Sequence, residues 1–230
     1  MAAQVTGDAH GLDRGKPAGK LAAHALSWLA DRSFPQDAAD WRRAWSEAGV
    51  ARDDLSCDVL VLNLPGWSAE PLRLTLRQAS SWAPSATPGE VVYVTENPAV
   101  VAAATDRIGD RAPTVVCVDG MPSTAALVIL DGLVASGCAV RYHGDFDWRG
   151  LAIAGVLGRK IAVAEPWRFR AADYKRAVRR GLGSVALSSR ATASPWDGEL
   201  AAAMKQSGVA IYEEQVLDEL LDDLSRGILR

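Results

Sequence analysis

Two aspartates separated by a single residue, Asp145 and Asp147, follow directly on a short apolar run at residues 139–143. Side chains of an extended chain alternate between its two faces, so residues two apart point the same way. The two carboxylates can therefore share one divalent cation. Oxygen ligands of this kind suit Mg²⁺ or Mn²⁺, and these ions suit phosphate chemistry.

A third carboxylate is expected to join this pair from another part of the chain. Glu96 follows the apolar run at residues 91–95 and precedes Asn97 and Pro98, which favour a helix start. Ligands of parallel α/β sheets gather at the carboxyl ends of the strands, so Glu96 meets the aspartates if the two strands are neighbours. Taken alone, Glu96 is better explained as an acid favoured by a helix N-terminus.

Four further side chains are weaker candidates. His143 precedes the aspartate pair, and a buried core histidine is a better explanation for it than an accessory site residue. Asp119 follows the apolar run at residues 114–118 and is a candidate further ligand or part of a phosphate-approaching turn. Glu213 and Glu214 complete a second metal site only if the C-terminal helix folds back over the sheet, and an exposed helix start explains them equally well.

The net charge of −3 hides a strong asymmetry along the chain. Residues 141–190 hold eleven Lys and Arg against four Asp and Glu, whereas residues 197–223 hold eight acids and one lysine. A basic block beside a carboxylate site suits a protein that holds a phosphate backbone, although a solvated helix face also explains the charges at residues 175–180. The candidate phosphate contacts are Arg149, Arg168, Arg170 and Lys175.

The order of the elements predicts how these residues are positioned. After a segment rich in Pro, Ser and Gly at residues 83–89, short apolar strands alternate with helices, which is typical of a parallel α/β sheet. We expect strands at residues 91–95, 114–118, 139–143, 160–164, 185–187 and 209–212, and helices ending near residues 108, 135 and 157. Two C-terminal helices are expected at residues 196–204 and 213–224.

Residues 1–88 are predicted to form a smaller, mainly helical subdomain, and residues 89–230 the main α/β domain. In the first part we expect a loop over the first twenty residues, helices at 21–30 and 37–48, a strand at 58–64, and a strand and helix within 72–82. Trp41 and Trp45 lie one helical turn apart in the second helix.

Composition is that of an ordinary soluble globular protein, with 49% hydrophobic and 23% charged residues. No apolar stretch reaches the roughly 18 residues of a membrane span, and the first twenty residues lack the apolar region of a secretory signal. Cys57, Cys117 and Cys138 are odd in number and far apart, which fits buried thiols in a reducing compartment. We therefore expect a cytoplasmic protein with no membrane partner.

The two acidic motifs resemble those of Toprim domains. Val-Tyr-Val-Thr-Glu-Asn-Pro at residues 92–98 and His-Gly-Asp-Phe-Asp-Trp-Arg-Gly-Leu-Ala-Ile-Ala at residues 143–154 look like the Toprim module of topoisomerase VI A subunits. The chain is more similar to the JetD family, the Toprim nuclease subunit of Wadjet plasmid-defence systems, in the branch with a C-terminal uncharacterised domain. This similarity covers nearly the whole chain, through residues 6–13, 96–98, 142–148, 167–169, 173–174 and 212–215.

The resemblance implies roles for the acidic residues. Asp145 and Asp147 would hold the catalytic metal, and Glu96 would hold a metal or act as general base and acid. Metal ions lower the pKa of bound water and neutralise charge that builds up on phosphorus oxygens. The resemblance thus implies a DNA endonuclease that uses Mg²⁺ or Mn²⁺, cuts double-stranded DNA and works with an SMC-like ATPase complex. It also admits a homodimer.

Two departures from the families define the alternatives. Topoisomerase VI A subunits carry a catalytic tyrosine upstream of Toprim, whereas this chain has no tyrosine in its first ninety residues, so hydrolysis is expected rather than transesterification. JetD relatives carry a further N-terminal region, so by this resemblance we expect a truncated or reduced member, which supports a non-catalytic DNA-binding or assembly module as the second hypothesis. A third is a phosphotransferase or phosphatase with an Asp-x-Asp nucleophile, which normally follows the first strand of its fold.

Overall fold

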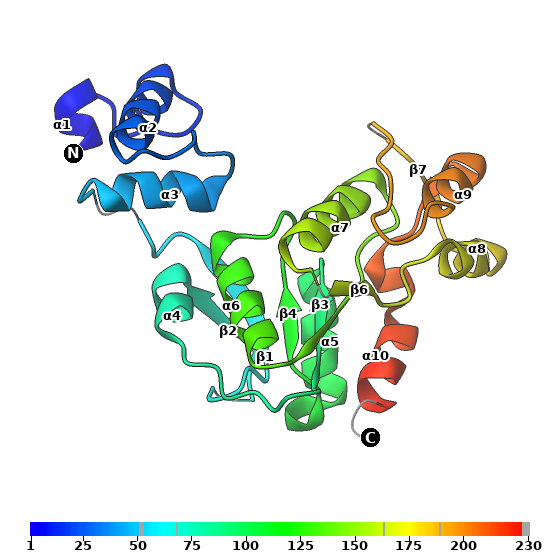
Figure 1. The fold of residues 1–230 in the computed structure, drawn as a ribbon. Helices are drawn as coiled ribbons and strands as arrows, with labels where there is room; N and C mark the ends of the chain where they lie inside the picture. The colour runs from blue at the N-terminus through cyan, green and yellow to red at the C-terminus, as the bar shows by residue number, and fades with distance from the viewer. Residues whose placement is uncertain (51–52, 68, 163, 189, 227–230) are drawn as a thin grey trace. The chain divides into compact units, whose positions relative to one another are not determined.

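The computed structural model describes residues 1–50, 53–67, 69–162, 164–188 and 190–226 (Figure 1). The chain divides into two compact units, Met1–Asp54 and Leu55–Arg230. The boundary predicted at residue 88 lies inside the second unit, because the strands β1 (Asp58–Leu62) and β2 (Leu72–Thr75) pair into its sheet. Within the described ranges, no helix combines the length and apolar character needed to cross a membrane.

The first unit contains the helices α1 (Ala2–Thr6), α2 (Pro17–Leu29) and α3 (Ala38–Glu47). Its small core brings Trp41 and Trp45 against Ala23, with the two indole ring centroids 6.3 Å apart. The expectation of a loop over the first twenty residues is wrong at both ends of that segment. A short helix forms at α1, and α2 begins at Pro17, whose fixed φ suits a first helical turn.

Six strands of the second unit form one mixed sheet in the order β2-β1-β4-β3-β5-β6. The strands β3 (Val91–Thr95), β4 (Val115–Cys117), β5 (Ala139–Tyr142) and β6 (Ala164–Pro166) run parallel, whereas β1 pairs antiparallel with both β2 and β4. The expected α/β fold, a mainly parallel sheet flanked by helices, is confirmed.

The connections between the strands define where the sheet can bind a ligand. Helix α5 (Pro98–Arg107) leads from β3 to β4, and α6 (Thr124–Ala135) leads from β4 back across β3 to β5. Figure 1 shows α5 and α6 on opposite sides of the sheet, with α10 (Leu217–Arg226) beside α5. The chain leaves β3 toward β4 but leaves β5 toward β6, in the opposite direction along the sheet. The carboxyl ends of β3 and β5 therefore form a topological switch point, where open α/β sheets bind ligands.

The strands at this point are buried on both faces, as expected of a covered parallel sheet. Val94, Val116 and Val140 are at most 1% exposed, and helices such as α6 and α7 (Trp148–Lys160) contribute Ile129 and Leu151 to the same core. The remaining elements are α4 (Leu76–Ser81), η1 (Gly109–Arg111), α8 (Ala171–Arg179), β7 (Val185–Ala186), α9 (Leu200–Ser207), β8 (Val209–Ala210) and η2 (Glu213–Gln215). β7 and β8 pair as a separate two-stranded sheet.

Three predicted boundaries are wrong. The strand expected at residues 160–164 is displaced, because buried Leu157 and Ile161 continue the apolar face of α7 and the Ile161 N–H donates to the Leu157 carbonyl at 2.7 Å. Val163, within that expected strand, lies outside the described residues. The two C-terminal helices begin later than expected, at Leu200 and Leu217.

Candidate metal centre

The three predicted acidic residues lie at the switch point. β3 and β5 pair in parallel with Val94 opposite Tyr142, and the His143 N–H extends the ladder to the Val94 carbonyl at 2.9 Å. Glu96 is the first residue after β3, and Asp145 follows β5 by three residues. The structure therefore brings Glu96 together with the aspartate pair.

Two glycines allow the loop after β5 to take this path. A Cβ atom added to Gly144 would lie 2.1 Å from the Tyr142 hydroxyl and 3.3 Å from Glu96 Oε2, and one added to Gly150 would lie 2.0 Å from the Asp145 carbonyl oxygen. Real Cβ atoms do not approach other atoms so closely. Side chains at these positions would displace the loop that carries both aspartates.

Each aspartate accepts a hydrogen bond from the backbone. Asp147 is the N-cap of α7, and its Oδ1 accepts from the Gly150 N–H at 2.6 Å. Asp145 Oδ1 accepts from the Glu213 N–H at 2.8 Å, which links the site to the C-terminal part of the chain. These contacts fix the direction of both side chains, as capping interactions do.

Burial and mutual repulsion perturb the carboxyl groups. Burial, followed by the charges of Asp145 and Asp147, raises the pKa of Glu96 to about 7. The pKa of Asp145 rises to about 6, chiefly through burial and despite the hydrogen bond from Glu213. Glu96 Oε2 is buried without a hydrogen-bond partner among the described residues. Such a group is stabilised by a proton or by a cation.

Glu213 is a fourth carboxylate at the same place. It is 0% exposed, and its Oε2 accepts from the backbone N–H groups of Glu96 at 3.1 Å and Asn97 at 2.5 Å. Burial raises its pKa well above the ordinary range, with the charges of Asp145 and Glu96 adding to the effect. Its Oε1 is buried and lacks a partner in the part of the chain that the structure describes. Glu214 lies alongside and accepts from Asn97 Nδ2 at 2.6 Å.

The C-terminal segment thus does return to the sheet, but not as the start of a helix. Glu213 and Glu214 lie in the 3₁₀ turn η2, and α10 begins only at Leu217. The sequence carried only a weak signal for this, the two adjacent acids ahead of an amphipathic helix. The contact between Glu213 and Glu96 joins residues 117 positions apart.

The residues fit a divalent cation by their chemistry. Carboxylate oxygens are the ligands that Mg²⁺ and Mn²⁺ prefer, and Glu96 and Glu213 each present a buried oxygen without a partner among the described residues. No three His, Cys, Asp or Glu side chains within the described ranges already have the arrangement of a formed metal site. The backbone hydrogen bonds to Asp145 and Asp147 engage Oδ1 of each, so the second carboxylate oxygen of each remains for a cation.

One of the four predicted phosphate contacts lies at this site. The charge of Arg149 lowers the pKa of both Glu96 and Asp145, although less strongly than burial raises it. The guanidinium of Arg149 lies against Gly120, in the loop after β4, and the residue is exposed. An exposed cation beside the carboxylates is well placed to contact a phosphate oxygen.

Of the other three predicted contacts, Arg168 and Lys175 face acids of the same chain with their side chains, and Arg170 contacts one through its backbone. Arg168 holds Asp223 through Nε and Nη2, at 2.5 and 2.7 Å, and Glu219 through Nη1 at 3.2 Å. Lys175 Nζ lies 3.8 Å from Glu199, and Arg170 lies at the N-terminus of α8, where its N–H donates to the Asp173 side chain.

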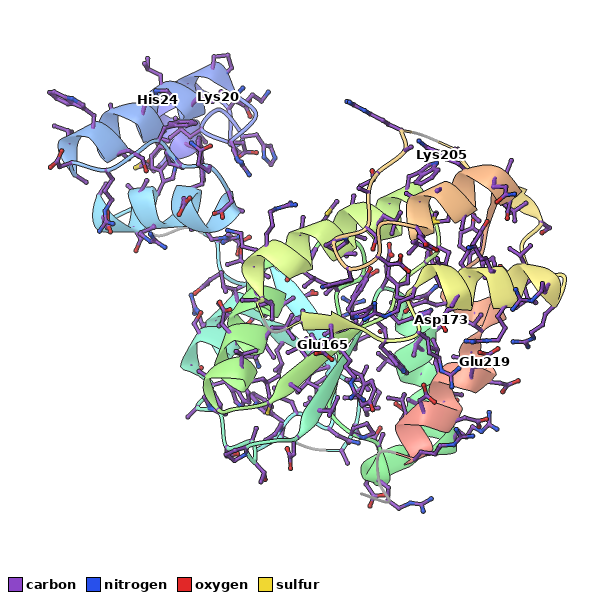
Figure 2. The ribbon with its side chains drawn as sticks, turned by 45° about the vertical axis from the view of Figure 1, so that its right-hand side comes forward. Lys20, His24, Glu165, Asp173, Lys205 and Glu219 are labelled. Atoms are coloured by element: carbon purple, nitrogen blue, oxygen red, sulfur yellow. The ribbon has the colours of Figure 1, made fainter. Side chains whose placement is uncertain are left out.

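This pairing extends over the two oppositely charged parts of the sequence. Arg176 contacts Asp173 at 2.7 Å, and both Arg176 and Arg180 contact Glu219. Figure 2 shows Asp173 and Glu219 on the adjoining helices α8 and α10. Much of the basic block that the sequence offers to a polyanion therefore neutralises the acidic C-terminal stretch.

The two accessory candidates lie off the carboxylate cluster. His143 is 1% exposed, and its imidazole packs among Phe146, Trp167 and Phe169 with ring centroids 5.6 to 5.9 Å away. Burial lowers its pKa to about 4, and Nδ1 lies 2.9 Å from the Trp167 carbonyl, so it is a neutral core histidine. The Asp119 carboxylate pairs with Arg73 at 2.9 Å.

Comparison with known families covers both parts of the chain. A family described as "Protein of unknown function C-terminus (DUF2399)" matches residues 72–224, and one described as "Protein of unknown function N-terminus (DUF3323)" matches residues 1–66. No curated protein matches the chain. The first match spans well over half of the 230 residues and includes every carboxylate of the candidate metal centre. The chain therefore belongs to the DUF2399 family of proteins of unknown function.

Proposed function

We propose that this protein is a metal-dependent DNA endonuclease of Toprim type, which hydrolyses phosphodiester bonds. The observation that carries the proposal is the meeting of Glu96, Asp145 and Asp147 at the switch point between β3 and β5, where Glu96 has a buried oxygen without a partner among the described residues. A cluster of carboxylates that repel one another is stabilised by binding a cation.

The proposed roles follow from the position of each group. Asp145 and Asp147 would hold Mg²⁺ or Mn²⁺, with Glu96 beside them. When bound, such an ion stabilises charge on phosphoryl oxygens and lowers the pKa of water. Glu96, which lies beside the two aspartates, can act as a carboxylate base that takes a proton from the attacking water and returns it to the leaving oxygen. Arg149 can hold a phosphate oxygen of the substrate.

Three of the four tyrosines favour attack by water. Tyr93, Tyr142 and Tyr174 are at most 5% exposed, so their hydroxyl groups are poorly placed to form a phosphotyrosine link with DNA, whereas Tyr212 is partly exposed. Tyr142 packs against Phe169 and Trp196 and is fully buried. Hydrolysis therefore remains the proposed reaction, in preference to transesterification.

The DNA substrate and the partner rest on the resemblance to the JetD family. The matches to DUF2399 and DUF3323 are consistent with a JetD-like protein. On this basis we propose double-stranded DNA, in particular small circular DNA, as the substrate and an SMC-like ATPase complex as the partner. The proposal includes action in the cytoplasm.

A second candidate function is a non-catalytic DNA-binding or assembly module with the same fold. It is favoured by the engagement of Asp145 and Asp147 with backbone N–H groups and by the lack of a formed three-ligand site among the described residues. Such a module would bind DNA without cutting it.

Plasmid cleavage distinguishes the two functions. In Mg²⁺ or Mn²⁺ we expect the wild-type protein, with its partner complex where needed, to cut plasmid, and Asp145→Asn to lose at least about 100-fold in rate because a metal-holding charge is removed. Asp106→Asn, which changes an exposed aspartate on α5, is the matched control and should cut as fast as wild type. An Asp145→Asn variant with full activity would overturn the nuclease proposal.

A further inference from the structure

A short C-terminal segment reaches the carboxylates from a distant part of the sequence. Residues 211–214, called the clasp below, lie next to the loop after β5. The Phe146 N–H donates to the Ile211 carbonyl at 2.8 Å, and the Glu213 N–H donates to Asp145 Oδ1 at 2.8 Å. The backbone of the clasp therefore holds one of the aspartates directly.

The side chains of the clasp hold the loop after β3. Glu213 Oε2 accepts from the N–H groups of both Glu96 and Asn97, and Glu214 accepts from the Asn97 side chain. Glu213 is thus the one described residue that touches the Glu96 loop with its side chain and the Asp145 side chain with its backbone. It joins the two strand ends that must act together.

The location of Glu213 gives its buried carboxyl group backbone donors to accept from. Its carboxylate lies at the N-terminus of α5, where backbone N–H groups lack partners within the helix and the helix dipole favours negative charge. By accepting from the Glu96 N–H, Glu213 fixes the direction in which the Glu96 side chain leaves β3. Without this acceptor, two partly buried N–H groups would lose their hydrogen-bond partner, which favours a different path for the loop after β3.

The clasp is anchored on its C-terminal side by α10. Arg107 of α5 contacts Asp218 at 2.8 Å, and Arg168 holds Asp223 and Glu219. These ion pairs tie α10 to the rest of the second unit and keep the clasp against the strand ends.

We propose that Glu213 is a positioning residue of the candidate metal centre, which orients Glu96 through its side chain and Asp145 through its backbone, so that the clasp completes the site. The part of this proposal that concerns metal binding rests on the proposed function. The alternative, in which Glu213 is itself a metal ligand, makes a different prediction for an amide side chain.

Two substitutions separate these roles. In Glu213→Gln the side-chain oxygen still accepts from both N–H groups, but an amide replaces the carboxyl group that could bind a cation, whereas Glu213→Ala removes the acceptor. We expect Glu213→Gln to bind Mn²⁺ within about threefold of wild type, and Glu213→Ala to bind it 10- to 100-fold more weakly, the range typical of residues that support metal ligands. Asp197→Ala is the matched control, because Asp197 also accepts from backbone N–H groups, those of Ala171 and Glu199.

Amide hydrogen exchange tests the clasp without any metal. We expect the Glu96 and Asn97 amides to exchange at least tenfold faster in Glu213→Ala than in wild type, and at nearly the wild-type rate in Glu213→Gln and Asp197→Ala. Unchanged exchange in Glu213→Ala would overturn the positioning role. Loss of Mn²⁺ binding in a folded Glu213→Gln variant would overturn it in favour of a ligand. If wild type binds no Mn²⁺, the proposed function fails while the exchange experiment still decides the positioning role.

Discussion

Glu96 combines two effects that act in the same direction on its ionisation. Burial disfavours the charged form, and the nearby Asp145 and Asp147 add repulsion, so its pKa rises to about 7. A carboxyl group in this range is half ionised near neutral pH and can both accept and donate a proton. The same property makes the folded protein sensitive to pH in the absence of a cation.

Stability in the absence of metal should therefore depend on pH through Glu96. Its folded-state pKa of about 7 lies above the ordinary value of 4.5, so the folded state binds the proton more tightly. The resulting stabilisation is complete below pH 4.5 and is lost as the pH rises through about 7. Each unit of difference between the folded-state and unfolded-state pKa of Glu96 corresponds to about 1.4 kcal/mol of folding free energy.

Denaturant unfolding in EDTA between pH 5 and pH 8 measures this effect. We expect wild type to lose more stability over this interval than Glu96→Gln, in which residue 96 does not titrate. Asp106→Asn should behave like wild type. Parallel pH profiles for wild type and Glu96→Gln would contradict the assignment of a raised pKa to Glu96.

Gly144 and Gly150 show how much of the site could be read from residue types. An apolar run followed by acids was sufficient to predict that Asp145 and Asp147 follow a strand. Strand alternation does not reach them, because β5 ends at Tyr142 and Asp147 is the N-cap of α7. Which glycines lack room for a side chain depends on contacts with Tyr142, Glu96 and the Asp145 backbone, which form only in the folded chain.

Among the elements, helices α8 and α10 decide what the basic residues do. Arg168 on the loop before α8 is 28% exposed on its side chain and is held by Asp223, which also accepts from the Trp167 indole at 2.9 Å. Arg149, at the start of α7, is exposed beside the carboxylates. The two arginines should therefore differ in function although both lie in the same basic block.

Alanine substitution should lower the stability at Arg168 and weaken DNA binding at Arg149. Arg168→Ala removes the cation that holds Asp223, while Glu219 keeps Arg176 and Arg180, and we expect the variant to lower the free energy of unfolding by about 2–4 kcal/mol. Arg149→Ala should leave stability nearly unchanged, weaken DNA binding and reduce the salt dependence of that binding by about one phosphate contact. Chemical denaturation and fluorescence anisotropy at several salt concentrations give the two readouts. A stable Arg168→Ala variant with weakened DNA binding would contradict this assignment.

Element boundaries followed from sequence where local signals agreed. Val91–Thr95 is both predicted and observed as a strand, since five apolar or β-branched residues are followed by Asn97 and Pro98 at a helix start. The displacement of β6 could not be foreseen, because Leu157 and Ile161 are equally compatible with a strand or with a longer helix. Tertiary packing decided between these two structures.

At the scale of the whole molecule, acids of the C-terminal part of the chain contact the loops after β3 and β5. In the sequence, an exposed helix start and part of a second metal site explain Glu213 and Glu214 equally well. In the fold, acids of this part of the chain pair with Arg107, Arg168 and Arg176, and Glu213 is buried against the Glu96 loop. Contacts across more than one hundred residues such as this one leave no periodic pattern in the sequence, so the clasp became visible only in the structure.

The central claim is that the carboxylates between β3 and β5, Asp145 and Asp147 with Glu96 beside them, bind a divalent cation. A crystal structure of the protein with Mn²⁺, with anomalous diffraction recorded to locate the ion, tests it most directly. We predict an anomalous peak within coordination distance, about 2.0–2.3 Å, of oxygens from at least two of these three residues, and loss of the peak in Asp145→Asn. A well-occupied wild-type crystal with no peak between β3 and β5 would contradict the account.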